Sequence, residues 1–211
     1  MEATIEQMNK LGANIIDPVE MATVGKFKDT EFEVLLYEFK ADLNTYLADL
    51  GPKAPVRSLA EIIAFNEHNR VNVMPYFDQE IMIMAQEKGS LTSSEYIEAL
   101  QNNHRLTREE GIDAALNEHQ LDAIIAPSGR PTWMTDLVNG DPGSHGSSSL
   151  AAIAGYPNIT VPAGYVFGLP VGINFFGGAY QEPTLIKLVY AFEQATKIRQ
   201  KPEFLPTADL N

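Results

Sequence analysis

A run of glycine and serine residues, GSHGSSS at positions 143–149, contains the residue types that build a nucleophilic site. Glycines let a substrate approach the backbone, and a serine beside a histidine can be activated as a nucleophile. With Asp136 upstream, a Ser147-His145-Asp136 triad can be written down. Residues so close in sequence seldom reach one another correctly, however, and the run lacks the G-x-S-x-G turn. We therefore expect Ser147 or Ser148 to cap the helix that follows, and an independent serine hydrolase using Ser147 is the weaker hypothesis.

Other kinds of catalytic site find little support in the sequence. The four histidines are far apart and form no His-Glu-x-x-His pattern, so we expect no metal site. The glycine-rich phosphate loops G-x-G-x-x-G and G-x-x-x-x-G-K-S/T do not occur, so no nucleotide or other cofactor is expected. The chain has no cysteine, which excludes disulfides and a thiol nucleophile.

The charge of the chain limits its partners. The 28 acidic residues against 15 basic ones give a formal net charge of -13, which opposes binding to nucleic acid and to anionic membranes. No apolar run approaches the roughly 20 residues of a membrane span. The N-terminus begins with Glu2 and Glu6 and does not resemble a basic, apolar signal. We therefore expect a cytoplasmic protein without nucleic-acid or membrane partners.

The segment 127–140 is the better candidate for a functional loop. It follows a predicted buried strand, at the end where open α/β sheets usually bind ligands. It carries the single tryptophan of the chain, Trp133, and so offers an aromatic wall with a few polar groups. The alternative, that Trp133 fills a gap in the core, is equally open at this point. The substrate-binding residues predicted from this loop are Pro127, Thr132, Trp133 and Asp136.

The elements around this loop predict an α/β fold. Short apolar runs bounded by glycine and proline predict buried strands at 122–126, 158–161 and 170–177. An alanine-rich segment at 149–155 predicts one or two helical turns that end at Gly155. The order of strand, loop, helix, strand, turn and strand is typical of α/β proteins.

Most of the remaining chain has helical spacing. Apolar residues at intervals of three and four predict helices at 2–10, 30–50, 58–69, 78–88, 92–119 and from 182 to about 195. Gly111 is a weak point of the fifth helix, residues 13–17 predict a further strand, and residues 71–77 predict irregular structure. The apolar stripe of the helix at 30–50 consists of Phe32, Leu35, Leu36, Phe39, Leu43, Tyr46, Leu47 and Leu50. We expect residues 1–211 to form a single α/β unit in which helices cover a sheet.

Several motifs recur in order along the later half of the chain. They are DAIIAPSGRPT at 122–132, GSSSLAAIAGYP at 146–157, VPAG at 161–164 and GLPVG at 168–172. Together they closely resemble the C-terminal part of the amidase signature family of serine hydrolases. Residues 1–20 resemble, more weakly, a helix and strand midway along its members. The resemblance implies part of that family's mixed-sheet fold, covered by helices.

The resemblance also implies where catalysis takes place. The family hydrolyses carboxamide C–N bonds through an acyl-enzyme, with a serine in a Gly/Ser-rich loop, a second serine in a cis peptide bond and an upstream lysine. In the family these residues precede the segment that residues 1–20 resemble, so we expect this chain to hold no catalytic residue. Ser147 lies in a turn near the family's cleft, so it is expected to line the acyl pocket and to join the substrate-binding residues.

We therefore predict a C-terminal fragment of an amidase that supplies core and substrate-pocket wall and is inactive alone. Its partners would be the missing N-terminal catalytic half and, in the complete enzyme, a small-molecule amide. An unpaired sheet edge and an exposed apolar face also favour a homo-oligomer. The alternative is a non-catalytic or split-gene half that pairs with a separately encoded catalytic half. The sequence does not separate an amidase from the related amidotransferases.

Overall fold

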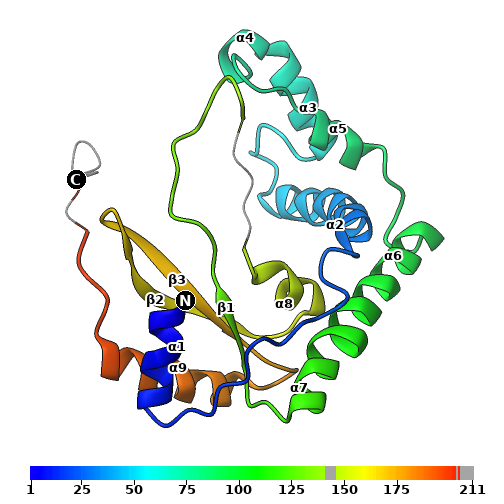
Figure 1. The fold of residues 1–211 in the computed structure, drawn as a ribbon. Helices are drawn as coiled ribbons and strands as arrows, with labels where there is room; N and C mark the ends of the chain where they lie inside the picture. The colour runs from blue at the N-terminus through cyan, green and yellow to red at the C-terminus, as the bar shows by residue number, and fades with distance from the viewer. Residues whose placement is uncertain (141–145, 203, 205–211) are drawn as a thin grey trace. The chain divides into compact units, whose positions relative to one another are not determined.

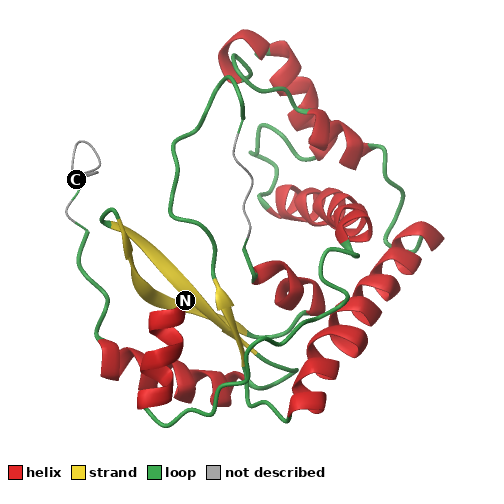
Figure 2. Ribbon diagram, viewed as in Figure 1, coloured by secondary structure: helices red, strands yellow, loops and turns green. Residues whose placement is uncertain are grey.

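A computed structural model describes residues 1–140, 146–202 and 204 of the chain (Figure 1). It divides into two compact units. The first, which we call the sheet unit, comprises Met1–Val24 and His104–Asn211, and the second, the helical unit, comprises Gly25–Asn103. The strands of the described residues all belong to the sheet unit (Figure 2). That residues 1–211 form a single unit stays a prediction.

The sheet contains three antiparallel strands in the order β1-β3-β2. They are β1 (Ile124–Pro127), β2 (Asn158–Val166) and β3 (Leu169–Phe176), which confirms the three strands predicted in this part of the sequence. β2 is longer than expected because the strand continues past Pro162 through an irregular register. Phe167 and Gly168 both have positive φ angles, as a tight two-residue hairpin turn requires, and they join β2 to β3.

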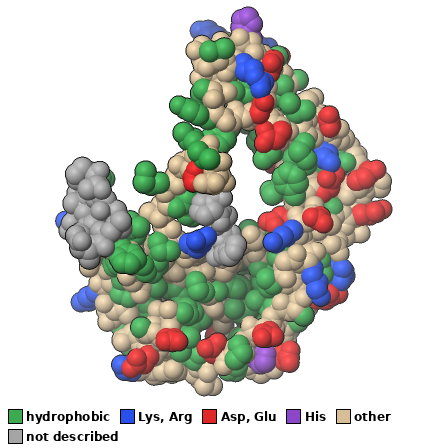
Figure 3. Space-filling model, turned by 45° about the horizontal axis from the view of Figure 1, so that its top comes forward, with side chains coloured by type: hydrophobic (Ala, Val, Ile, Leu, Met, Phe, Trp, Pro, Cys, Tyr) green, Lys and Arg blue, Asp and Glu red, His purple; other side chains and the backbone are tan. Residues whose placement is uncertain are grey.

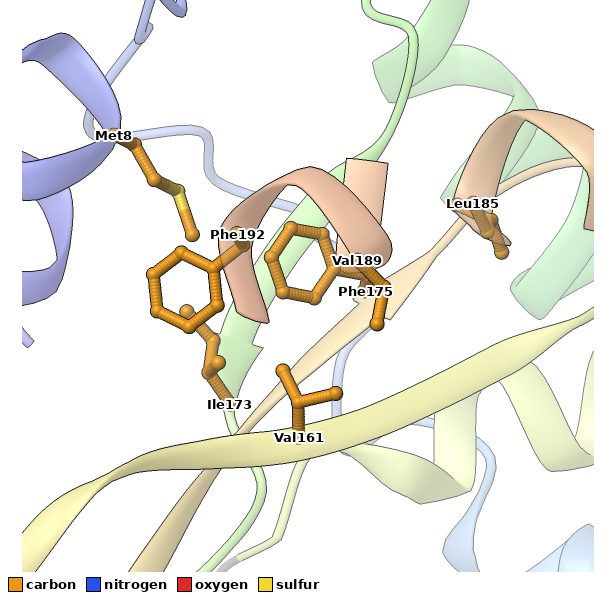
Figure 4. Packing of buried hydrophobic residues seen from close by; sticks show 7 residues of the cluster. All are labelled: Met8, Val161, Ile173, Phe175, Leu185, Val189 and Phe192. Carbon is orange, nitrogen blue, oxygen red and sulfur yellow. The ribbon is translucent and has the colours of Figure 1, made fainter. Parts of the chain in front are cut away.

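One face of the sheet forms the core of this unit. Side chains alternate along a strand, so Ile173 and Phe175 point to the same face. There they pack against α9 (Glu182–Thr196) and α1 (Glu2–Lys10), both predicted from helical spacing. The rings of Phe175 and Phe192 are 6.0 Å apart between centroids. The side chains that converge on this core are Met8, Val161, Ile173, Phe175, Leu185, Val189 and Phe192 (Figure 4).

The opposite face of the sheet carries α8 (Ser148–Ala154), the predicted alanine-rich helix (Figure 1). The helix buries Leu150, Ala151 and Ala154, and Gly155 ends it in the left-handed conformation with φ of 66°. Arg108 donates a hydrogen bond from Nε to the carbonyl oxygen of Ala154, with 2.6 Å between the two atoms. A cation is favourable at a helix C-terminus, so this contact holds α8 in place.

Arg108 belongs to a long helical segment with an irregular middle. The segment consists of α6 (Ser94–His104), the π-helix η1 (Arg105–Ile112) and α7 (Asp113–His119). Gly111, the predicted weak point, lies in the π-helical part, where a β-carbon would be only 2.7 Å from the carbonyl oxygen of Leu106. The prediction of one interrupted helix is confirmed, and only glycine fits the close approach at its interruption.

The helical unit is built around its first helix. Its elements up to α6 are α2 (Lys28–Asp49), α3 (Leu59–His68), α4 (Arg70–Val73) and α5 (Glu80–Gln86). Leu36 packs with Leu59 and Ala85, while Tyr37 packs with Tyr96. α4 is a short helix inside the segment predicted to be irregular, so that prediction was wrong for its first residues.

The apolar stripe predicted for α2 is only partly buried. Leu36 and Leu47 are buried, as expected. Other members of the stripe are exposed, namely Phe32, Leu35, Phe39, Tyr46 and Leu50. Apolar side chains, green in Figure 3, also reach the surface elsewhere. The helix therefore carries more apolar surface than its own unit covers.

The strand predicted at 13–17 was wrong. The structure gives residues 13–20 no regular secondary structure. A strand exists only where its N–H and C=O groups meet a neighbouring strand, and the described residues provide no such neighbour for this segment. None of the described helices combines the length and the apolar character that crossing a bilayer would need.

Candidate substrate-pocket wall

A buried side-chain amide contacts Ser147, one of the predicted substrate-binding residues. Asn174, in β3, has only 1% of its surface exposed. Its Oδ1 atom accepts hydrogen bonds from Ser128 Oγ, at 2.7 Å, and from Thr160 Oγ1. Its Nδ2 atom donates to Ser147 Oγ at 2.9 Å. We call these four residues, Asn174, Ser128, Thr160 and Ser147, the Asn174 cluster.

The cluster joins the end of β1 to the start of α8. Ser147 donates a hydrogen bond from Oγ to the carbonyl oxygen of Pro127, at 2.8 Å. The backbone N–H of Ser128 donates to the carbonyl oxygen of Gly172, at 2.9 Å. Two of the predicted site residues, Pro127 and Ser147, are therefore brought into direct contact although 20 positions separate them.

The prediction that the Ser147 side chain caps the following helix was wrong. Ser147 stands at the N-cap position of α8, but its side chain makes no hydrogen bond to the free N–H groups of that helix. The hydroxyl bonds instead to Asn174 and Pro127. These tertiary contacts take the side chain away from the helix terminus.

The geometry of Ser147 favours a positioning hydroxyl over a nucleophile. Its two hydrogen-bond partners are an amide nitrogen and a backbone carbonyl, neither of which acts as a general base. In the triad written from the sequence, His145 lies outside the described residues. The third member, Asp136, accepts hydrogen bonds at Oδ1 from the N–H groups of Val138 and Asn139, both at 2.9 Å.

The remaining predicted site residues lie along the loop between β1 and α8. The hydrogen bonds from the side chain and backbone of Asn139, and from the Val138 N–H, lower the pKa of the Asp136 carboxyl below its usual value. The same hydrogen bonds close the turn that follows Asp136. Thr132 and Trp133 are exposed, and 42% of the Trp133 surface is accessible. Trp133 therefore does not fill a core gap in the described structure, and its place in a pocket wall stays a prediction.

Sequence reasoning missed Asn174, Ser128 and Thr160. A signal was present in β3, where Asn174 interrupts an apolar run, VGINFF. Asparagine is depleted in strands, and a buried side-chain amide is almost always hydrogen-bonded. An asparagine in the middle of a buried strand therefore predicts polar partners, although it does not say which residues they are.

A second feature is a cavity of about 940 Å³ in the sheet unit. Its walls include the irregular segment 11–19, residues 119–127 and parts of α1 and α9. The apolar side chains in its lining include Ile5, Met8, Ile15, Ile125, Leu188 and Phe192. β1 pairs with β3 along one edge, and among the described residues no strand pairs with the other. The cavity therefore lies beside backbone groups that can still pair with a strand.

Comparisons with known proteins identify the class of protein that has this fold. The family model described as Amidase matches residues 1–186, so the chain belongs to the amidase family. This confirms the resemblance to the amidase signature family seen in the sequence. A probable amidase of Arabidopsis thaliana is 39% identical over 207 residues, which cover 95% of this chain and 37% of that protein.

Solved structures and shorter matches agree with this assignment. The native peptide amidase from Stenotrophomonas maltophilia is 41% identical with a TM-score of 0.87, and the match covers 96% of this chain and 40% of that one. A glutamyl-tRNA(Gln) amidotransferase protein of Desulforudis audaxviator is 47% identical over 60 residues, which cover 28% of this chain and 12% of that protein. The chain thus spans about two fifths of the length of the amidases that it matches throughout.

Proposed function

We propose that this chain is the later portion of an amidase and that it supplies core and substrate-pocket wall for hydrolysis of a carboxamide C–N bond. The observation that carries the proposal is the Asn174 cluster, which ties Ser128 and Ser147, on either side of the tryptophan-bearing loop, to the sheet. Such a loop can shape a pocket. The partners of Ser147 provide no general base, so the chain is proposed to be inactive alone.

The proposed macromolecular partner is the N-terminal catalytic portion of the amidase. The cavity beside β1 supports it, because an apolar cavity next to a strand edge that no described strand covers is a suitable place for an additional strand. The amidases that match the chain are much longer than the part it covers, so they contain sequence from which such a strand can come. In this proposal the catalytic serines and lysine come with that portion.

The proposed substrate is a small amide. The solved relative from Stenotrophomonas maltophilia is a peptide amidase, which makes an amidated peptide the first substrate to test. The match to the amidotransferase protein covers too little of either chain to favour that second activity.

Reconstitution tests the proposal. The chain is expressed alone and together with the N-terminal portion of the Stenotrophomonas maltophilia peptide amidase that it does not match. Ammonia release from an amidated peptide is measured, and serines are labelled with a fluorophosphonate probe. We expect no label and no activity from the chain alone, whereas the mixture is active and labelled on the N-terminal portion.

Labelling also decides between this proposal and its alternatives. A stoichiometric label on Ser147 of the isolated chain, lost in Ser147→Ala, would establish an independent serine hydrolase. Tight binding of the two portions without activity would favour the non-catalytic interaction half. The homo-oligomer stays a prediction, and light scattering of the isolated chain at high concentration measures it; a monomer would contradict it.

A further inference from the structure

We propose that Asn174 is a positioning residue for the substrate pocket, because its buried amide fixes both ends of the loop that carries Trp133. The inference rests on the proposed function, in which this loop forms the pocket wall. Asn174 itself is buried and does not touch substrate. It acts through Ser128 and Ser147, which flank the loop on its two sides.

The side-chain amide of Asn174 both accepts and donates hydrogen bonds within the cluster. A side-chain amide has two N–H donors and an oxygen with two acceptor positions. Oδ1 accepts from Ser128 and Thr160, and Nδ2 donates to Ser147. An apolar side chain at position 174 could make none of these hydrogen bonds. A carboxylate could still accept from Ser128 and Thr160, but it could not donate to Ser147.

The donor group of Asn174 directs the hydroxyl proton of Ser147. Because Nδ2 donates to Ser147 Oγ, the hydroxyl proton of Ser147 is free to point at the carbonyl oxygen of Pro127, 2.8 Å away. A carboxylate at position 174 would instead accept that proton. Asn174→Asp therefore keeps acceptors for Ser128 and Thr160 but releases the contact between α8 and the end of β1.

The hydrogen bonds of the cluster also bear on the loop that carries Trp133. The described part of the loop, residues 129–140, is largely exposed and lies between the anchored residues Ser128 and Ser147. The hydrogen bonds of Asn174 to Ser128 and Ser147 therefore constrain the two points between which the loop runs. A shift of about 1 Å in a pocket wall is enough to change the rate of an enzyme by up to about a hundredfold.

The experiment uses the full chain and its single tryptophan as the reporter. Trp133 emission and its quenching by acrylamide are measured in the parent, in Asn174→Asp and in the control Ser148→Ala, whose side chain is exposed next to Ser147. We expect Asn174→Asp to increase quenching and shift the emission to longer wavelength, while Ser148→Ala matches the parent. If Asn174→Asp does not fold, Ser147→Ala removes the same link between Asn174 and Pro127 and is expected to behave in the same way.

Unchanged Trp133 quenching in a folded Asn174→Asp or Ser147→Ala chain would overturn the inference. In the reconstituted amidase, positioning predicts a KM for the amidated peptide that rises about tenfold while kcat changes little. A merely structural role would lower the folded fraction without raising KM. Failure of reconstitution would count against the proposed function alone, because the fluorescence measurement uses only this chain.

Discussion

Gly172 lies so close to Ser128 that a β-carbon on Gly172 would stand 2.8 Å from the Oγ atom of Ser128. The same β-carbon would be 2.9 Å from Cγ2 of Thr160. Both neighbours belong to the Asn174 cluster, so a side chain at position 172 would displace them.

Gly172→Ala is therefore expected to destabilise the chain. Overpacking of this kind costs about 1–3 kcal/mol of unfolding free energy, and here it also displaces hydrogen-bonded hydroxyls. The matched control is Gly164→Ala in β2, where a β-carbon would meet no atom within 4 Å. Urea unfolding of both variants measures the difference, and equal stability of the two would contradict the close packing described for Gly172.

Phe192→Ala tests the core between the sheet and α9. Phe192 is 3% exposed and its ring pairs with that of Phe175. Removing a buried phenyl ring costs about 3–5 kcal/mol because a cavity remains. Tyr190→Ala, on the same helix but 63% exposed, is expected to cost at most about 0.5 kcal/mol. Thermal unfolding followed by circular dichroism compares the two, and a similar loss in both would show that α9 packs differently.

Elements that depend on short segments of sequence could be predicted, whereas those that depend on distant partners could not. The strands β1, β2 and β3 and the helices α8 and α9 were predicted because apolar periodicity and glycine or proline stops are properties of short segments. The strand at 13–17 failed because a strand depends on a partner, and none is available among the described residues.

The candidate site was likewise predictable only in its local parts. The loop and its Trp133 could be predicted from composition and from the strand before it. Asn174 could not be connected with Ser128, Thr160 and Ser147, because their separations of 46, 14 and 27 residues carry no periodic signal. Periodicity also predicted the apolar face of α2 correctly, but it could not show which surface covers that face, and several residues of the stripe are exposed.

Ser58→Ala tests the N-cap of α3. Ser58 Oγ accepts a hydrogen bond from the Glu61 N–H, at 3.2 Å, while the Glu61 carboxylate accepts one from the Arg57 N–H. Loss of an N-cap costs about 0.5–2 kcal/mol. Ser58→Asn keeps a capping oxygen, so its unfolding free energy should stay close to that of the parent. Chemical denaturation measures both, and equal losses would mean that the oxygen does not cap the helix.

The stability of the helical unit should depend on alkaline pH through Tyr96. Tyr96 donates a hydrogen bond from its hydroxyl to Glu38 Oε1, at 2.8 Å. Burial first, and then the hydrogen bond and the negative charge of Glu38, raise the pKa of Tyr96 to about 12. The usual tyrosine pKa is about 10, so between these values the folded chain holds a proton that the unfolded chain has lost.

The sign follows from that difference in bound protons. The contribution of Tyr96 to stability is complete below about pH 10 and is lost as pH rises towards about 12. The unfolding free energy of the parent should therefore fall more steeply above about pH 10 than that of Tyr96→Phe, which has no hydroxyl to titrate. Glu38→Gln removes the charge and lowers the pKa of Tyr96 in the folded chain, so the fall that begins near pH 10 should become smaller and end at a lower pH. Parallel pH profiles for the parent and Tyr96→Phe would contradict the raised pKa, because the phenylalanine variant lacks the titrating group.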